Sequence, residues 1–182
     1  MKNSTNDGFD QHYNVQVAVE QESFLIVSNT LSNHVTDQYE AIPTLDAIPT
    51  EVGTPKAGAL DAGYFSEDNV AYLDGERIDP YVATGRQKHG ESPPAVPRGR
   101  IPKGSTVKDR MSRKLRTKKG RETYSKRKGT VEPVFGQIKE VRGLRRFLLR
   151  GFQNVRGEWS LMCLTHNLLK LFRSGQYVPA FA

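Results

Sequence analysis

The chain has 182 residues, of which 36% are hydrophobic, and a formal net charge of +7. This length suits one domain, or one domain with a flexible arm. A single cysteine, Cys163, excludes an internal disulfide, and its place in an apolar run favours a small buried residue over a reactive thiol. The N-terminus has no apolar stretch of a signal peptide, and the longest apolar segment, 159–172, is shorter than the ~20 residues of a membrane span. We therefore expect a cytoplasmic protein with no membrane partner.

The positive charge is concentrated in one segment, residues 98–128. This segment holds fourteen Lys and Arg residues against Asp109 and Glu122, so its net charge is 14 − 2 = +12 and the rest of the chain sums to 7 − 12 = −5. A local cationic block seeks a polyanion. Nucleic acid is the expected one, because each neutralised phosphate releases counterions and gives affinity independent of base sequence.

The first elements in chain order are strands. The period-two alternation over 13–19 predicts a strand, and the apolar run 24–28 predicts a second strand, buried on both faces. A polar turn between them makes a hairpin. A helix is expected over 37–48, with Thr36 as its N-cap and two prolines that shorten or bend it.

A strand–helix–strand unit follows the hairpin. Residues 57–60 form the first predicted strand, a helix capped by Ser66 runs to about Asp74, and residues 78–84 form the second strand. This order is typical of a parallel crossover.

The second half begins with a loop and ends in helices. Residues 85–104 carry four glycines and four prolines and are predicted to be a loop. Helical spacing of apolar residues returns over 131–138, and 158–172 is apolar nearly all round, which predicts a buried helix. We divide the chain into a sheet with its first helices, a basic loop or insertion, and C-terminal helices that complete the same domain, at residues 1–84, 85–120 and 121–182.

One acidic residue, Asp61, stands at the end of the predicted strand 57–60. Ligands gather at the carboxyl ends of strands in α/β sheets, and a carboxylate there could hold a hard cation such as Mg²⁺. The structural alternative is a turn aspartate that accepts hydrogen bonds from its own backbone.

A second acidic residue, Glu132, lies just off the apolar stripe of the helix predicted over 131–138. Lys139 is seven positions further and about 20° away around an ideal helix, and Lys128 is four positions before. The functional interpretation is a metal-binding carboxylate beside phosphate-binding lysines. The structural alternative is a solvated face with pairing between residues four apart.

Two motifs together resemble the catalytic region of DDE transposases of bacterial insertion sequences, in the group with a Tyr-x₂-Arg-x₃-Glu-x₆-Lys signature. They are Ala-Leu-Asp-Ala-Gly-Tyr at 59–64 and the segment 124–139, and residues 9–19 and 145–172 look similar to the same group. The resemblance implies an α/β, ribonuclease-H-like fold with a mixed sheet and flanking helices. It also implies metal-dependent DNA cleavage and strand transfer.

By that resemblance Asp61 corresponds to the second catalytic aspartate and Glu132 to the catalytic glutamate. Both would bind Mg²⁺ or Mn²⁺ in a two-metal site. Tyr124, Arg127 and Lys139 would grip DNA near the scissile phosphate.

The sequence departs from this family in two places. The signature has three residues between its arginine and Glu132, a gap that Lys128 keeps and Arg127 does not. The family's first catalytic aspartate lies on a strand before the first residue of this chain, and the nearest acids, Asp7 and Asp10, lie in a polar lead. The expectation is a copy truncated at its N-terminal strand, and a poor strand-transfer enzyme by itself.

Two other functions stay open at this point. One is a catalytically inactive remnant whose basic arm, 98–128, binds DNA or RNA through phosphates. The other is a metal nuclease of the same fold, with Asp7 or Asp10 as a substitute acid. The expected partner is double-stranded DNA at transposon ends and target, bound by a single chain or a homo-oligomer in the bacterial nucleoid. The four histidines show no metal-ligand spacing, so we expect structural or surface roles for them.

Overall fold

The computed structural model describes residues 12–85 and 95–175. The chain divides into two compact units, which we describe separately. Unit 1 comprises Met1–Val35, Pro43–Pro49 and Thr130–Ala182, and unit 2 comprises Thr36–Ile42 and Thr50–Gly129.

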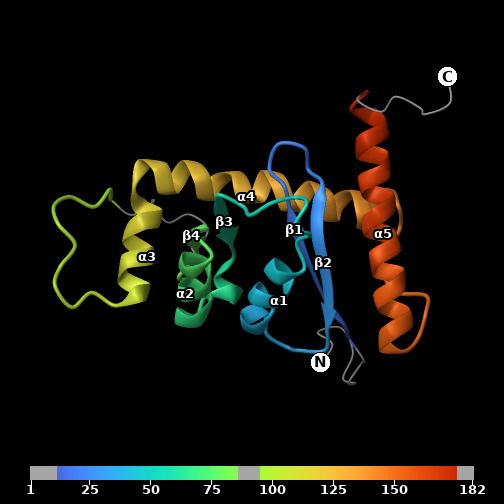
Figure 1. The fold of residues 1–182 in the computed structure, drawn as a ribbon, viewed down its shortest axis with the longest axis horizontal. Coiled ribbons are helices and arrows are strands. Elements are labelled where there is room, and N and C mark those ends of the chain that lie inside the picture. Colours follow the sequence, from blue (N-terminus) through green and yellow to red (C-terminus); the bar gives the residue numbers. More distant parts are fainter. Residues whose placement is uncertain (1–11, 86–94, 176–182) are drawn as a thin grey trace. The chain divides into compact units, whose positions relative to one another are not determined.

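Each unit combines helices with a two-stranded sheet (Figure 1). The expected α/β class is therefore confirmed, and the mixture of small sheets and several helices is compatible with a ribonuclease-H-like fold. None of the helices within the two described ranges is long and apolar enough to cross a membrane.

Unit 1 contains the predicted hairpin, in which β1 (Asn14–Val19) pairs antiparallel with β2 (Ile26–Ser32). The bounds of the second strand were predicted wrongly. Phe24 adopts a left-handed conformation with φ 61°, so the strand starts after it. Nor is β2 buried on both faces, because only Ile26, Ser28 and Leu31 are buried and the residues between them are half-buried.

Helix α5 (Phe152–Arg173) packs against β2 (Figure 1). The side chain of Asn167 binds the first residue of that strand twice. The backbone N–H of Ile26 donates to Asn167 Oδ1 at 2.8 Å, and Asn167 Nδ2 donates to the Ile26 carbonyl at 2.7 Å. The predicted helix is confirmed and is longer than expected.

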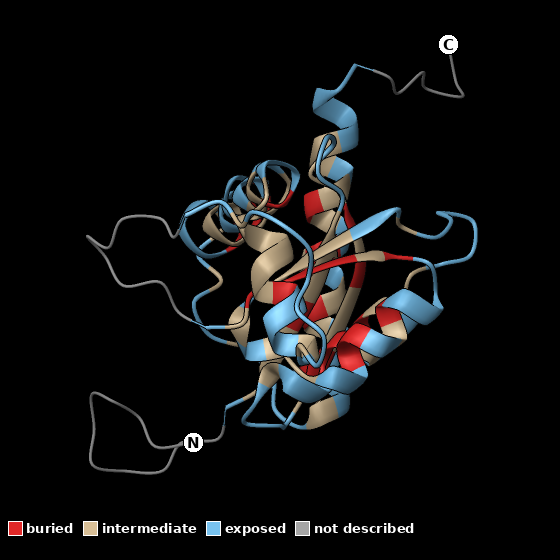
Figure 2. Cartoon of the chain, turned by 90° about the vertical axis from the view of Figure 1, so that its left-hand side faces the viewer, coloured by how far each residue is buried: buried red, intermediate tan, exposed pale blue. Residues whose placement is uncertain are grey.

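The prediction that α5 is buried all round is wrong. Its buried residues are Val155, Trp159, Cys163 and His166. The leucines on its other side are exposed, and the last turn before the C-terminus is exposed as well (Figure 2). An apolar composition favours burial of a helix, but a hairpin with one packing face covers one side only.

The core of unit 1 joins β2, α5 and the end of α4 (Lys118–Gly136). Val134 and Ile138 are each 1% exposed in this core. The rings of Phe135 and Trp159 stack with centroids 6.2 Å apart. The apolar spacing predicted over 131–138 therefore marks the buried side of this segment.

The helix expected over 37–48 is divided into a short 3₁₀ turn, η1 (Asp37–Tyr39), and α1 (Ala41–Asp46). Thr36 is the N-cap, as predicted, and accepts from Gln38 N at 3.3 Å. The N–H of Glu40 donates to the carbonyl of Asp37, a bond that closes a 3₁₀ turn and separates the two pieces.

Unit 2 contains the predicted parallel crossover. Strand β3 (Ala57–Leu60) pairs in parallel with β4 (Asp79–Val82), and α2 (Glu67–Gly75) connects them. Ser66 caps α2 as expected, since its Oγ accepts from Asn69 N at 3.0 Å. The core of this unit is apolar, and its most deeply buried residues are Leu73, Tyr81 and Val82.

The segment expected to be a basic loop contains a helix, α3 (Val107–Arg116). A capping box starts it: Asp109 N donates to Thr106 Oγ1 at 3.1 Å, and Thr106 N donates to Asp109 Oδ2 at 3.2 Å. Met111 is its buried residue. Residues 95–104 form neither helix nor strand, as predicted, and the rest of that predicted loop, 86–94, lies outside the described residues.

Helix α4 begins close to the end of α3, and Gly120 makes this approach feasible. A Cβ at Gly120 would lie 2.0 Å from the carbonyl oxygen of Lys114. Thr117 bridges the two helices, because its Oγ1 donates to that carbonyl at 2.7 Å and accepts from Gly120 N at 3.0 Å.

Past Gly136 the chain changes to a π-type turn, η3 (Gln137–Val141). The separation of about 20° expected between Glu132 and Lys139 assumed a straight α-helix, and the wider π turn alters it.

Candidate active site

Asp61 lies at the carboxyl end of β3, where it caps the 3₁₀ turn η2 (Ala62–Tyr64). Its two carboxylate oxygens have different partners. Oδ1 accepts from Ala62 N at 2.8 Å, and Oδ2 lies 3.4 Å from Nη2 of Arg127 on α4. One carboxylate oxygen of Asp61 therefore caps its own turn, as the structural alternative predicted, while the other contacts Arg127 of the motif at 124–139.

Arg127 faces Asp61 from a largely buried position. Its side chain is 16% exposed, against 56% for Asp61, and its guanidinium carbon lies 5.7 Å from the ring centroid of Tyr124. Its Nε is buried and has no hydrogen-bond acceptor within the described part of the chain. A buried guanidinium needs an anionic neighbour, so the Asp61 carboxylate stabilises Arg127 as well as the reverse.

Tyr124 and Tyr64 are the aromatic neighbours of this pair. Burial raises the pKa of the Tyr124 hydroxyl, Arg127 opposes the rise, and Asp61 adds to it. Burial also raises the pKa of Tyr64, and the negative charges of Asp37, Asp61 and Glu40 raise it further. Both hydroxyls are therefore neutral and protonated at physiological pH.

Asn69 on α2 fixes the turn that follows Asp61. Its Nδ2 donates to the Tyr64 carbonyl at 2.7 Å and to the Gln38 carbonyl at 2.8 Å, so it ties η2 to η1. Asn69 is 3% exposed. Sequence reasoning missed this residue, because an asparagine inside a helix signals no long-range bond.

Glu132, Lys128 and Lys139 are all exposed. Within the described ranges, the Glu132 side chain forms no hydrogen bond or ion pair, so the pairing with Lys128 that the structural alternative required is absent. The ammonium of Lys139 lies 5.3 Å from the ring centroid of Phe135. Glu132 thus has a free carboxylate on the surface of its helix.

The structure therefore brings Asp61, Arg127 and Tyr124 together inside unit 2. Glu132 and Lys139 belong to unit 1, and Lys128 extends into solvent from unit 2. The acids Asp7 and Asp10, considered above as substitutes, lie outside the described residues.

The side chains of Asp61 and Glu132 have the chemistry of divalent-metal ligands. The carboxylates of Asp61 and Glu132 are the hard oxygen ligands that Mg²⁺ prefers. Residues 12–85 and 95–175 contain no group of three or more His, Cys, Asp or Glu side chains that could hold a metal by themselves. The donor chemistry fits, with each acid offering one ligand.

Some cations of the basic segment form contacts within unit 2, others are exposed, and Lys119 does both. Asp79 on β4 binds two of them, with Lys114 Nζ at 2.5 Å and Lys119 Nζ at 3.2 Å, and accepts from the Tyr81 hydroxyl at 2.8 Å. Arg113 donates to the carbonyls of the preceding loop. The exposed cations of α3, α4 and the loop before them are Arg98, Arg100, Lys103, Lys108, Arg110, Lys118, Lys119, Lys126 and Lys128.

Asp79 is the second residue that sequence reasoning missed. Burial alone would raise its pKa, but hydrogen bonds from Lys114, Tyr81 and Lys119 outweigh that and lower the pKa to about 2. Asp79 therefore stays ionised and anchors the basic helices. Nothing in the sequence indicated this role, because Lys114 and Lys119 are 35 and 40 positions away along the chain.

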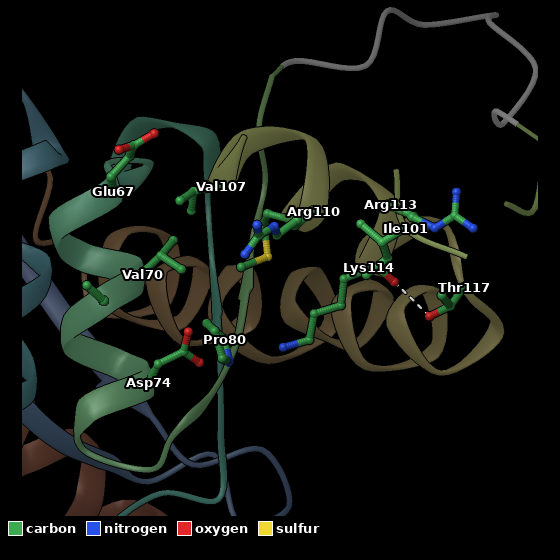
Figure 3. Close-up of a pocket in the computed structure, with 12 residues that line it drawn as sticks. Glu67, Val70, Asp74, Pro80, Ile101, Val107, Arg110, Arg113, Lys114 and Thr117 are labelled. Atoms are coloured by element: carbon green, nitrogen blue, oxygen red, sulfur yellow. Dashed lines mark hydrogen bonds between the residues drawn. The ribbon is translucent and has the colours of Figure 1, made fainter. Parts of the chain in front are cut away.

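A pocket of about 520 Å³ lies between α2, β4 and α3 (Figure 3). Acidic Glu67 and Asp74 come from α2, and basic Arg110, Arg113 and Lys114 come from α3. Neither Asp61 nor Arg127 lines this pocket, so it is separate from the candidate site.

Cys163 and His166 are structural, as predicted. Burial raises the pKa of the Cys163 thiol to about 12. His166 is 1% exposed, with Nε2 3.0 Å from the Phe24 carbonyl and Nδ1 against the Gln137 side-chain amide. His12 and His34 are exposed, and the fourth histidine lies outside the described residues.

Residues 100–172 match the family model described as a transposase DDE domain. The match covers less than half of the chain, includes Glu132 and the cations of α3 and α4, and begins after Asp61. It supports a DDE transposase catalytic region in this segment. No curated protein and no solved structure matches the chain.

Proposed function

We propose that this chain carries catalytic residues of a DDE-type DNA transposase of an insertion sequence, which cleaves double-stranded DNA at transposon ends and joins it to target DNA. The observation that carries the proposal is the contact between Asp61 and Arg127. It joins Asp61, at the end of a strand, to α4, the helix that also carries Glu132. Helix α4 lies inside the segment that matches the transposase domain.

Asp61 and Glu132 are the proposed metal ligands, each supplying one carboxylate to Mg²⁺ or Mn²⁺ in a two-metal site. Such ions activate the attacking oxygen and stabilise the leaving oxygen. Water attack leaves a 3′-OH on the transposon end. That hydroxyl then attacks a target phosphodiester, so one phosphate ester bond forms as another breaks and no covalent protein intermediate is needed.

Arg127 is proposed to position Asp61. A guanidinium 3.4 Å from Oδ2 holds the carboxylate in one orientation before DNA binds. Because Arg127 is largely buried, the exposed Lys128 is better placed to bind a phosphate. We therefore assign Lys128 as the cation of the signature that binds DNA, and Lys139 as a second DNA-binding cation. Tyr124 is packed beside Arg127.

The exposed cations of the loop before α3, of α3 and of α4 provide the proposed DNA-binding surface. Their affinity would come from phosphates and would fall steeply with salt. Copies of the chain would act together on the two transposon ends, and this substrate would place the protein at the bacterial nucleoid.

The test is cleavage of labelled duplexes taken from the DNA that flanks the coding sequence, in Mg²⁺ or Mn²⁺. Asp61→Asn and Glu132→Gln should each lower the cleavage rate at least ~100-fold and leave DNA affinity within about threefold. Glu122→Gln is the matched control, since Glu122 is exposed on the same helix as Glu132. Cleavage that both variants retain would reject the assignment of Asp61 and Glu132, and salt-dependent binding without cleavage in either metal would favour a DNA-binding module.

A further inference from the structure

Helix α5 has two apolar faces on opposite sides. Val155, Trp159 and Cys163 lie on the face buried in the core of unit 1. The second face consists of large apolar side chains that are 44% to 74% exposed, namely Leu161, Leu164, Leu168, Leu171 and Phe172. At 100° per residue the two faces are centred about 180° apart. The side chains that form the core of unit 1 therefore lie away from this second face, which we name the leucine stripe.

The spacing of the leucine stripe is regular. Its four leucines follow one another at intervals of three, four and three residues. This is the a/d spacing of a heptad, which places one seam of a helix against a second helix. A helix that needs a single packing face carries one such stripe, whereas α5 carries a further one beyond its core face.

We propose that the leucine stripe is an interface with a second copy of this chain, formed by two α5 helices packed side by side. The positions of α5 that flank the seam are all uncharged: Ser160, Thr165, Asn167, Phe172 and Ser174. The flanking positions of α5 therefore add no like-charge repulsion between two copies. One charge from outside the helix lies beside this flank, since Arg142 Nη2 donates to the Thr165 carbonyl at 2.7 Å. Lys170 and Arg173 lie at positions away from the seam, so the stripe itself attracts no polyanion.

The area of the stripe fits a weak dimer. Five half-exposed apolar side chains present on the order of 500 Å² per copy, the size of the largest patch on a typical monomer. Two copies would bury about 1,000 Å², near the lower limit for a specific interface, over about two heptads. Two chains bound to one DNA through their basic segments would be held at high local concentration, which would strengthen this contact.

The first experiment is cysteine cross-linking of the full chain. The native Cys163 is 2% exposed and does not compete. Leu161→Cys and Leu171→Cys place a thiol at each end of the stripe, and Arg173→Cys is the control on the far side of the same helix. Mild oxidation should give a disulfide-linked dimer of twice 20.4 kDa at ten times the control yield or more.

The pattern of cross-links also gives the orientation of the helices. In a parallel pair each variant links to itself, whereas in an antiparallel pair the mixture of Leu161→Cys with Leu171→Cys gives the product. A yield no higher than that of Arg173→Cys, for both variants and for their mixture, would overturn the proposal. It would mean that another segment or another protein covers the stripe.

Sedimentation in about 0.3 M salt provides the second measurement, since the salt screens the basic segments. The wild-type mass should rise above 20.4 kDa with concentration, and the double variant Leu164→Glu, Leu168→Glu should stay monomeric. Val141→Glu, also highly exposed in unit 1, is the control and should associate like wild type. Circular dichroism should show all variants folded, because the altered side chains lie outside the core. A wild-type chain that stays monomeric up to about 1 mM would reject the interface.

Discussion

Helices α5 and α3 are attached to their sheets by different kinds of contact. Helix α5 binds β2 through a buried apolar row that includes Trp159 and Cys163. Helix α3 buries one residue, Met111, and is otherwise held by the Lys114–Asp79 ion pair and by its contact with the start of α4. The first attachment depends on packing volume, and the second depends on charge and on close backbone approach. Added salt should therefore leave the attachment of α5 unchanged and weaken the attachment of α3.

The largest effect should come from removing volume at Trp159, which is 2% exposed. Trp159→Ala should lower the free energy of unfolding of unit 1 by about 3–5 kcal/mol. Trp159→Phe should cost far less, because the indole N–H is buried and has no acceptor among the described residues. Urea unfolding followed by circular dichroism measures both. Equal losses for the two variants would contradict this, because a phenyl ring would then restore none of the packing that alanine removes.

A smaller loss is expected at Gly120, where α3 and α4 meet. A methyl group 2.0 Å from the Lys114 carbonyl must push the helices apart, so Gly120→Ala should destabilise unit 2 by about 1–3 kcal/mol. Gly129→Ala in the same helix has open space and should stabilise by up to about 1 kcal/mol. Thermal unfolding of the two variants compares them. A stabilised Gly120→Ala would mean that this approach does not occur.

Local patterns in the sequence predicted what local contacts determine. Thr36 and Ser66 are caps because a hydroxyl reaches a backbone N–H within three residues, and this depends on the sequence nearby. Helix α3 could have been found in the same way, since Thr106 and Asp109 have the spacing of a capping box, but the surrounding charges and glycines favoured a loop.

Contacts between distant segments could not be predicted. Asp61 was selected for its place at a strand end, yet its pairing with Arg127 depends on how α4 crosses unit 2. In α5 the sequence showed apolar residues nearly all round, and only the structure shows that the hairpin covers one side. Sequence patterns give the number of apolar faces, whereas packing decides which of them are buried.

Acid should weaken the attachment of α3. The folded-state pKa of Asp79, about 2, lies below the unfolded value of about 3.9. The resulting stability is therefore present above about pH 4 and is lost as the pH falls towards 2. Because the Asp79 side chain is 38% exposed, solvent limits the effect to about 1 kcal/mol or less. Asp79→Asn should remove this dependence, as measured by thermal unfolding at pH 5 and pH 2.5. An unchanged acid profile would show that α3 is held by packing after all.

The smallest effect expected is a separate pH window for α5, caused by His166. Burial lowers the pKa of this imidazole, while its hydrogen bond to the Phe24 carbonyl partly restores it. The unfolded chain therefore binds the proton more readily, so the stability of unit 1 is present above about pH 6.5 and declines below it. Trp159, the single tryptophan, reports unfolding of unit 1 by fluorescence. In urea, wild type should lose stability between pH 7.5 and 5.5, and His166→Gln should not. His34→Gln, at an exposed histidine, should behave like wild type. If His166→Gln keeps the wild-type slope over this range, the pH dependence of unit 1 arises from another group.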